Sequence, residues 1–487
     1  MVLHEYFVLL GSSPLCMSES HSPTNSNGPN NAQQALAKAS LFAITWPILV
    51  EQLSHILPGM IDIFMISHLG DDAAAGVSVA NQIVVFFIVL FSFIGLGCSV
   101  VITHYLGAGD RNGAEDVAHN ALGINVWLGL FISIMTLLFS EQMLGLLRLP
   151  PSLLPYARPF LALMGGTLFL EAINIVLAAI LRAHAHTKQV MVVALGMNVI
   201  NIALNAVLIF GLLDFIGLPA LGVVGAAIST VISRALACMA YFVLARRLLN
   251  FHVRLTALWR FSRDIIAKIL HIGIPSAGEN LCWWTSFMVI TYFIAQMGAT
   301  QMATFTYAMQ LSMIMMILSI AIGIGTEIII GHLVGAGELE RAYQQLLQSL
   351  RIGVGLTVAM TVVVVLCAKP LFGLFTSQPE IIAAGAQLLL VSLILEPGRT
   401  FNLVVINSLR ATGDARFPLY AGLISMWGVA VVLAWLLGLH WGWGLVGVWL
   451  AFAIDEWVRG LLMYRRWRRR AWVPYAIATR AKLETNS

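Results

Sequence analysis

The hydrophobic positions of this 487-residue chain fall into twelve long runs separated by short polar turns. A helix that crosses a bilayer needs about 20 mostly apolar residues, and each run is about that long or longer. The runs do not alternate between polar and apolar positions, so they predict helices rather than strands. The predicted helices span residues 41–66, 74–105, 117–140, 157–181, 189–212, 219–245, 267–296, 301–333, 344–367, 383–409, 417–438 and 444–464.

The composition indicates which class of protein has this pattern. Apolar residues make up 59% of the chain and charged residues 10%, whereas soluble domains carry about 25% charged residues. This excludes a cytosolic enzyme, a secreted disulfide scaffold and a disordered chain, and it predicts an all-α membrane protein. The five cysteines lack zinc spacing, and His184 and His186 have no further ligands beside them, so we expect no metal, no cofactor and no enzyme activity. Residues 1–35 include a polar Ser/Asn/Pro stretch and predict a disordered tail.

Basic residues are sorted between the two sides of the predicted membrane segments. Loops on one side carry only Arg148, Arg158 and Lys369. Loops on the other side carry twelve basic residues, and the basic run 465–470 follows the last helix on that side. The positive-inside rule therefore predicts that both termini lie in the cytoplasm. We interpret the basic run as an orientation anchor rather than a site for lipid head groups or nucleic acid.

The second half of the chain repeats the first at an offset of 228 residues. The matching pairs include Pro47 and Pro275, Glu51 and Glu279, Gln82 and Gln310, His104 and His332, Gly107-Ala108-Gly109 and Gly335-Ala336-Gly337, and Leu181-Arg182-Ala183 and Leu409-Arg410-Ala411. Each repeat has six helices, an even number, so both halves start on the same side of the membrane and are parallel repeats. Such halves typically place a substrate cavity between them and alternate its access, which favours a secondary transporter. The sequence contains no Walker motif, so we do not expect ATP to drive transport.

The order of these motifs resembles the prokaryotic type of the multidrug and toxic compound extrusion (MATE) family, within a wider flippase-like superfamily. The resemblance covers about residues 36–470 and rests on Ile61-Asp62-Ile63 before Leu69-Gly70, the Gly-Ala-Gly and Leu-Arg-Ala motifs, Asn201 to Gly211, Gly222 to Thr230, and Leu409 to Asp414. It implies two six-helix lobes arranged as a V and cation-driven antiport of organic compounds. We place the N-lobe at 36–250, the C-lobe at 251–470 and a cytoplasmic C-terminal tail at 471–487.

Ionisable residues within the predicted helices are candidates for transport chemistry, because they are costly in lipid. On the first helix, steps of three or four residues place one set on a single helical face: Pro47, Glu51, His55, Pro58 and Asp62. A face with two acids and a histidine should look at a cavity or the lobe interior. The prolines permit a bend, which suits a helix that moves.

Polar residues on the fifth and sixth helices lie at a depth similar to that of Asp62. Asn201 and Asn205 share one face of the fifth helix, and Ala226 and Thr230 are one turn apart on the sixth. With Asp62 they could form a hard-oxygen cation site or a protonation site. The alternative is that the asparagines only bond between helices.

The resemblance implies a cation-coupling site in the N-lobe, formed by Asp62, Asn201, Asn205, Ala226 and Thr230. The family often has Asp where this chain has Asn205, so Asp62 remains as the single titrating group. This departure favours H+ over Na+ as the coupling cation. The repeat gives an independent argument, because the position equivalent to Asp62 is Ile290. An acid present in only one half breaks the symmetry, as a coupling site can.

A second set of polar residues is a candidate lining for the substrate cavity: Glu51, His55, Gln82, Asn198, Glu279, Gln310 and Glu327. Glu51 and Glu279 occur at equivalent positions of the two halves, so an architectural role and the binding of a cationic substrate both stay open. Elsewhere, the spacing of Glu396 and Arg399, and of Asp455-Glu456 and Arg459, predicts ion pairs within helices.

The sequence thus predicts a monomeric antiporter in the plasma membrane of a prokaryote (the inner membrane if Gram-negative). It would span the lipid bilayer, bind no nucleic acid and export small organic compounds of cationic or amphipathic character. The alternatives are a flippase for lipid-linked precursors and a dedicated exporter of a metabolite such as a flavin. A channel and a non-transporting membrane scaffold are the remaining readings.

Overall fold

The computed structural model describes residues 41–147, 149–211, 220–253, 259 and 261–484. The tail predicted at 1–35 lies outside these residues. Over the described residues the chain folds into helices without strands, which confirms the predicted all-α class. Each of the twelve predicted segments coincides with a helix or with a broken helix in this part of the chain.

The helices follow one another in two sets of similar order. The first repeat contains α2 (Leu41–Ser67), α3 (Asp71–Gly107), α4 (Arg111–Leu146), α5 (Leu154–Gly166), α6 (Leu168–Ala183), α7 (Thr187–Phe210) and α8 (Gly222–Leu249). The second contains α9 (Arg263–Ala295), α10 (Ala299–Ala336), α11 (Leu339–Leu366), α12 (Ala368–Gly373), α13 (Pro379–Ala411), α14 (Arg416–Ser425), η2 (Met426–Val431), η3 (Ala434–His440) and α15 (Gly444–Arg468). The final helix is α16 (Val473–Glu484).

Two predicted segments are interrupted. The fourth is the pair α5 and α6, which meet at Thr167 at an angle of 47°. The eleventh begins as α14 and continues in the wider turns of η2 and η3. Of the described helices, eight are long and apolar enough on their own to cross a membrane, or nine if the bent pair counts as one span. The helix α15 carries Asp455, Glu456 and Arg459 along its middle.

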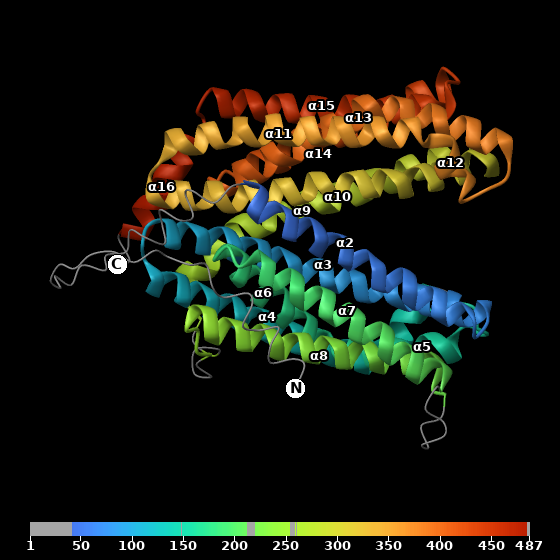
Figure 1. The fold of residues 1–487 in the computed structure, drawn as a ribbon, viewed down its shortest axis with the longest axis horizontal. Helices are drawn as coiled ribbons and strands as arrows, with labels where there is room; N and C mark the ends of the chain where they lie inside the picture. Colours follow the sequence, from blue (N-terminus) through green and yellow to red (C-terminus); the bar gives the residue numbers. More distant parts are fainter. Residues whose placement is uncertain (1–40, 148, 212–219, 254–258, 260, 485–487) are drawn as a thin grey trace, which may run out of the picture.

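The two repeats form two layers that lie at an angle to each other. Figure 1 shows α4, α6, α7 and α8 in one layer and α10, α11, α13 and α15 in the other. The layers lie close together at the end where α16 is found and further apart at the opposite end (Figure 1). Each layer has its own buried apolar clusters, so each repeat has the core of a lobe.

The first helix of each repeat also packs into the opposite lobe. Ile44 and Ile48 of α2 belong to the apolar cluster of α10, α11, α13 and α15. Ile269 and Ile272 of α9 belong to the cluster of α3, α4 and α6. These exchanged ends tie the lobes together at the narrow end of the molecule.

The helices α3 and α10 cross at that end with almost no space between their backbones. A Cβ atom at Gly107 would overlap the carbonyl oxygen of His332, and one at Gly335 would overlap that of His104. Only glycine permits so close an approach. This explains why the first glycine of the Gly-Ala-Gly motif recurs in both repeats.

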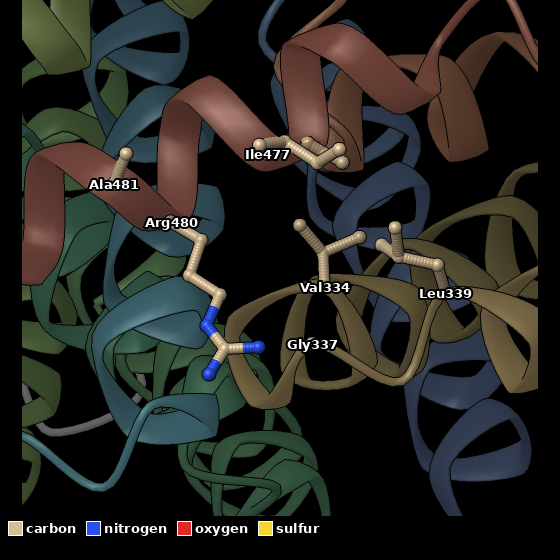
Figure 2. Close-up of a pocket in the computed structure, with 7 residues that line it drawn as sticks. Val334, Gly337, Leu339, Ile477, Arg480 and Ala481 are labelled. Carbon is tan, nitrogen blue, oxygen red and sulfur yellow. The ribbon is translucent and has the colours of Figure 1, made fainter.

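The C-terminal helix α16 folds back onto this crossing. It packs against α10 and α3, one helix from each repeat. Trp467 and Trp472, both fully buried, stack at a centroid distance of 4.4 Å and fix the turn that leads into it. Figure 2 shows Arg480 pointing from α16 toward Gly337, beside a small pocket at the end of α10. The C-terminal segment is therefore a packed helix over the described residues.

Candidate functional site

Three helices of the first repeat, α2, α7 and α8, bring together a polar network inside the lobe. The side-chain amide of Asn205 donates to the Oδ1 of Asp62 at 2.5 Å and to the Oδ1 of Asn201 at 3.3 Å. The amide of Asn201 donates to the hydroxyl of Thr230 at 3.1 Å. These contacts confirm the prediction that the four residues lie together, which the shared depth of three separate helices indicated.

Ser229 completes the network and was not among the predicted residues. Its hydroxyl donates to the Oδ1 of Asn205 and to the carbonyl oxygen of Ala226. The hydroxyl of Thr230 donates to the same carbonyl at 3.0 Å. Position 229 is next to a predicted residue on the same helix, so a count of hydroxyls along the sixth predicted helix would have found it.

The network offers one carboxylate among neutral oxygen and amide groups. Asn201, Asn205 and Ser229 are buried, whereas Asp62 is half-buried. The carboxylate, the hydroxyls and the Ala226 carbonyl are hard oxygen donors of the kind that bind hard cations. The carboxylate can also hold a proton. The arrangement therefore fits a site that takes up a single positive charge.

The buried acid Glu51 is engaged by the arginine of the first Leu-Arg-Ala motif. Its Oε1 lies 2.5 Å from the Nη1 of Arg182 and 3.7 Å from the Nε2 of His55. Glu51 is 1% exposed, whereas half of the His55 side chain is exposed. One turn further along α2, the backbone carbonyl of Ser54 accepts a hydrogen bond of 2.5 Å from Asn198.

The second repeat has the same ion pair at the equivalent place. Arg410, from the second Leu-Arg-Ala motif, places its Nη2 2.7 Å from the Oε2 of Glu279. Both residues are buried. A matching pair in each lobe is what an architectural role for Glu51 and Glu279 predicts.

A second symmetrical pair of contacts joins the lobes to each other. The Nε2 of His104 lies 2.6 Å from the carbonyl oxygen of Ala411, and the Nε2 of His332 lies 2.8 Å from that of Ala183. All four residues are buried. The sequence singled out these histidines only as repeats, because nothing along the chain shows that each reaches into the other half.

The remaining cavity candidates lie outside the Asp62 network. Gln82 on α3 and Gln310 on α10 are exposed, and the hydrogen bonds of the described residues do not connect them to Asp62. Glu327 on α10 is 5% exposed, and its Oε2 is buried without a hydrogen-bond partner in the described structure. The guanidinium groups of Arg410 and Arg182 act on its carboxylate electrostatically.

The predicted ion pairs of the second repeat are present and merge into one buried cluster. The Nη1 of Arg399 lies 3.0 Å from the Oε1 of Glu396. The Nη2 of Arg459 lies 2.7 Å from Asp455 and 3.1 Å from Glu456. These contacts confirm both predictions. The acids of this cluster are matched by arginines, unlike Asp62, which faces amides.

The fold and the site together define a membrane transporter built from two parallel repeats. Comparison with known proteins gives the family. The MatE family pattern matches residues 47–207 and 275–436, once in each repeat. Because these matches cover more than half of the chain, the protein belongs to the MatE family of transporters.

Similar proteins cover nearly the whole chain. It is 42% identical over 439 residues to a protein of Bacillus subtilis (strain 168) named "Uncharacterized transporter YisQ", covering 90% of this chain and 96% of that protein. It is 27% identical over 463 residues to a "Probable multidrug resistance protein NorM" of Bradyrhizobium diazoefficiens, covering 92% and 96%. A structure described as MATE in the bent conformation superposes with a TM-score of 0.82 at 22% identity, covering 92% of this chain and 99% of that one.

Proposed function

We propose that this transporter is an antiporter that exports small organic compounds in exchange for protons, and that Asp62 carries the proton. The observation that supports this most directly is the Asp62 network. It holds one carboxylate among amides and hydroxyls on three helices that belong to one lobe. The other lobe has Ile290 at the equivalent position, so the two lobes differ where a driving cation would act.

A proton suits this carboxylate better than a sodium ion. Sodium sites gather several oxygen donors, whereas an N–H group of Asn205 occupies Oδ1 of Asp62. Protonation needs only the carboxylate itself and removes its charge from a half-buried place, which lowers the cost of that burial. Proton uptake would weaken the bond to Asn205, and α2 could then change its bend relative to α7.

Alternating access follows from where the lobes touch. The contacts between His104 and Ala411, between His332 and Ala183, and between α3 and α10 all lie at the narrow end of the molecule. The distribution of basic residues supports a cytoplasmic location for this end. The described conformation is then closed toward the cytoplasm, and export requires these contacts to break and reform as the lobes rock.

Substrate class and location are inferred from the relatives and from charge. Several relatives are named as probable multidrug resistance proteins, which supports export of varied small organic compounds. We propose a cationic or amphipathic character for these compounds because the ionisable residues within the predicted helices are mainly acidic. The relatives are prokaryotic, which supports placement in the plasma membrane with both termini in the cytoplasm. We propose that the monomer is the transporting unit, because each chain contains both lobes.

The test is a flux assay in proteoliposomes with proton and sodium gradients imposed separately. A proton gradient should drive export of a fluorescent organic cation by the wild type, and Asp62→Asn should abolish that flux. Asp72→Asn is the matched control, because it removes an exposed acid at the start of α3 and should leave the flux unchanged. Proton-driven flux that survives Asp62→Asn would overturn the proposal.

A further inference from the structure

A buried ion pair lies between α6 and α8, close to the Asp62 network. The Nε of Arg234 lies 3.0 Å from the Oε2 of Glu171. Arg234 is 9% exposed, and its Nη1 is buried without a hydrogen-bond partner in the described structure. The amide of Asn174 donates to the backbone carbonyl of Arg234 at 3.1 Å and fixes this part of α8. The guanidinium therefore has an unused donor in a buried place.

Arg234 lies on the same face of α8 as Thr230, a residue of the Asp62 network. Arg234 lies one helical turn from Thr230 on α8, so the two side chains share a face. Its guanidinium acts electrostatically on the carboxylate of Asp62, on which Asn205 is the only hydrogen-bonding side chain among the described residues. The positive charge is thus fixed beside the network without a direct ion pair to Asp62.

In the part of the chain that the structure describes, no charged group on the other helices around α2 forms an ion pair or a hydrogen bond with Asp62. The helices α3, α7, α8 and α10 pack against α2. On α3, Asp71 and Asp72 are exposed at the first turn. On α10, Glu327 lies under the influence of Arg410 and Arg182. On α2 itself, Glu51 is paired with Arg182, and α7 presents asparagines at this level.

The second lobe has the same pair with its charges exchanged. The offset of 228 places Arg399 where the first lobe has Glu171. In the last helix, Gly444 and Gly447 match Gly222 and Gly225, and this register places Glu456 where the first lobe has Arg234. The Nε of Arg399 lies 3.7 Å from the Oε1 of Glu456. A base therefore occupies the α8 position in the lobe that has Asp62, and an acid occupies it in the lobe that has Ile290.

We propose that Arg234, held in place by Glu171, sets the proton affinity of Asp62 and excludes sodium from the site. This inference rests on the proposed function. A fixed positive charge in a low-dielectric interior opposes any cation that arrives at the carboxylate. A proton forms a covalent O–H bond with the carboxylate, so it keeps a useful affinity despite the repulsion from Arg234. Sodium, with one carboxylate and few free oxygens to bind it, loses its affinity. Arg234 is a specificity residue that acts through Asp62.

The test compares pairs that keep the interior neutral. The exchange Glu171→Arg with Arg234→Glu gives the first lobe the polarity of the second. Glu171→Gln with Arg234→Gln removes both charges. In each, the pH at which proton-driven flux is half-maximal should rise by on the order of one unit, and an imposed sodium gradient should begin to drive flux. Arg234→Lys keeps the charge and should return the pH profile toward that of the wild type.

Three outcomes would overturn the inference. The first is a double variant with an unchanged pH profile and no sodium-driven flux, provided that it elutes as a folded protein in size-exclusion chromatography and still transports. The second is sodium-driven flux in the wild type, which needs no variant to fold. The third is an Arg234→Lys profile that matches the neutral pair. Each leaves the proposed function standing if Asp62→Asn still abolishes proton-driven flux, so the failure of one is distinguishable from the failure of the other.

Discussion

The two lobes share their frame and differ in their polar interiors. Each lobe pairs a buried glutamate with the arginine of its Leu-Arg-Ala motif, and each sends one histidine to a carbonyl of the other lobe. Only the first lobe has Asp62 in a network of amides and hydroxyls. The second has acids matched by arginines instead. Contacts that occur twice are what an architectural role predicts, and the network around Asp62, which occurs once, is where we propose that the driving cation is coupled.

The largest expected effect comes from breaking one of the repeated ion pairs. Glu51→Gln should cost about 3 kcal/mol in unfolding free energy, because it leaves the partly buried Arg182 guanidinium without its carboxylate partner. Glu279→Gln should cost a similar amount by orphaning Arg410. Denaturant titration in mixed micelles measures both.

The matched variants separate structure from substrate binding. Glu51→Gln combined with Arg182→Gln removes both charges and should be less destabilising than Glu51→Gln alone. If Glu279→Gln instead leaves stability unchanged and alters which compounds are exported, Glu279 is a substrate ligand. The two ion pairs would then occupy equivalent positions without sharing a structural role.

The next effect concerns the crossing of α3 and α10. Gly107→Ala and Gly335→Ala should each cost about 3 kcal/mol, because the added methyl group meets a backbone carbonyl of the other lobe that cannot move aside. Gly145→Ala is the control, since a Cβ there meets no atom within 4 Å. Thermal unfolding in detergent checks the difference. Equal effects at all three positions would contradict the close approach.

A smaller effect is expected from the contacts between the lobes. His104→Leu and His332→Leu each remove one hydrogen bond to a buried carbonyl, which should cost about 1 kcal/mol in unfolding free energy. Both should also raise the fraction of molecules open to the cytoplasm, measured by labelling a cysteine placed on α16. A change in only one variant would show that the lobes do not share this contact equally.

The smallest effect is a pH dependence that differs between equivalent loop positions. Burial lowers the pKa of His186, whereas burial raises the pKa of Asp414 despite a hydrogen bond from Arg466. On acidification, His186 therefore takes up its proton in the unfolded chain at a higher pH than in the folded chain. The stability that neutral His186 gives to the fold is lost as pH falls from about 7 to 5. His186→Asn should flatten this loss of thermal stability.

The equivalent substitution in the second lobe should act with the opposite sign. The raised pKa of Asp414 gives a contribution that is present at low pH and lost as pH rises above about 4. Asp414→Asn should remove that loss. If both variants shift the pH dependence in the same direction, burial does not control these two groups.

The sequence predicted most of the fold because a membrane helix can be recognised from its own run of apolar residues. Long apolar runs, turn residues and a fixed repeat offset located all twelve segments and the two-lobe class. Local signals did not show the bend between α5 and α6 or the wide turns after α14. The first break follows Gly165 and Gly166, but glycines also occur inside helices of this chain without a break beside them, such as Gly129 in α4, so their presence alone does not predict a bend. The tail predicted at 1–35 lies outside the described residues.

The sequence also determined which polar residues belong to one helical face, since helical spacing fixes that without reference to other helices. Together with the shared depth of three helices, this spacing predicted that Asp62, Asn201, Asn205 and Thr230 lie close together. Only the tertiary structure decided which partner each charge meets. The pairing of Glu51 with Arg182 joins residues 131 positions apart, and the bond from His104 to Ala411 spans 307. The spacing of residues along the chain does not predict such contacts, because they depend on how whole helices cross.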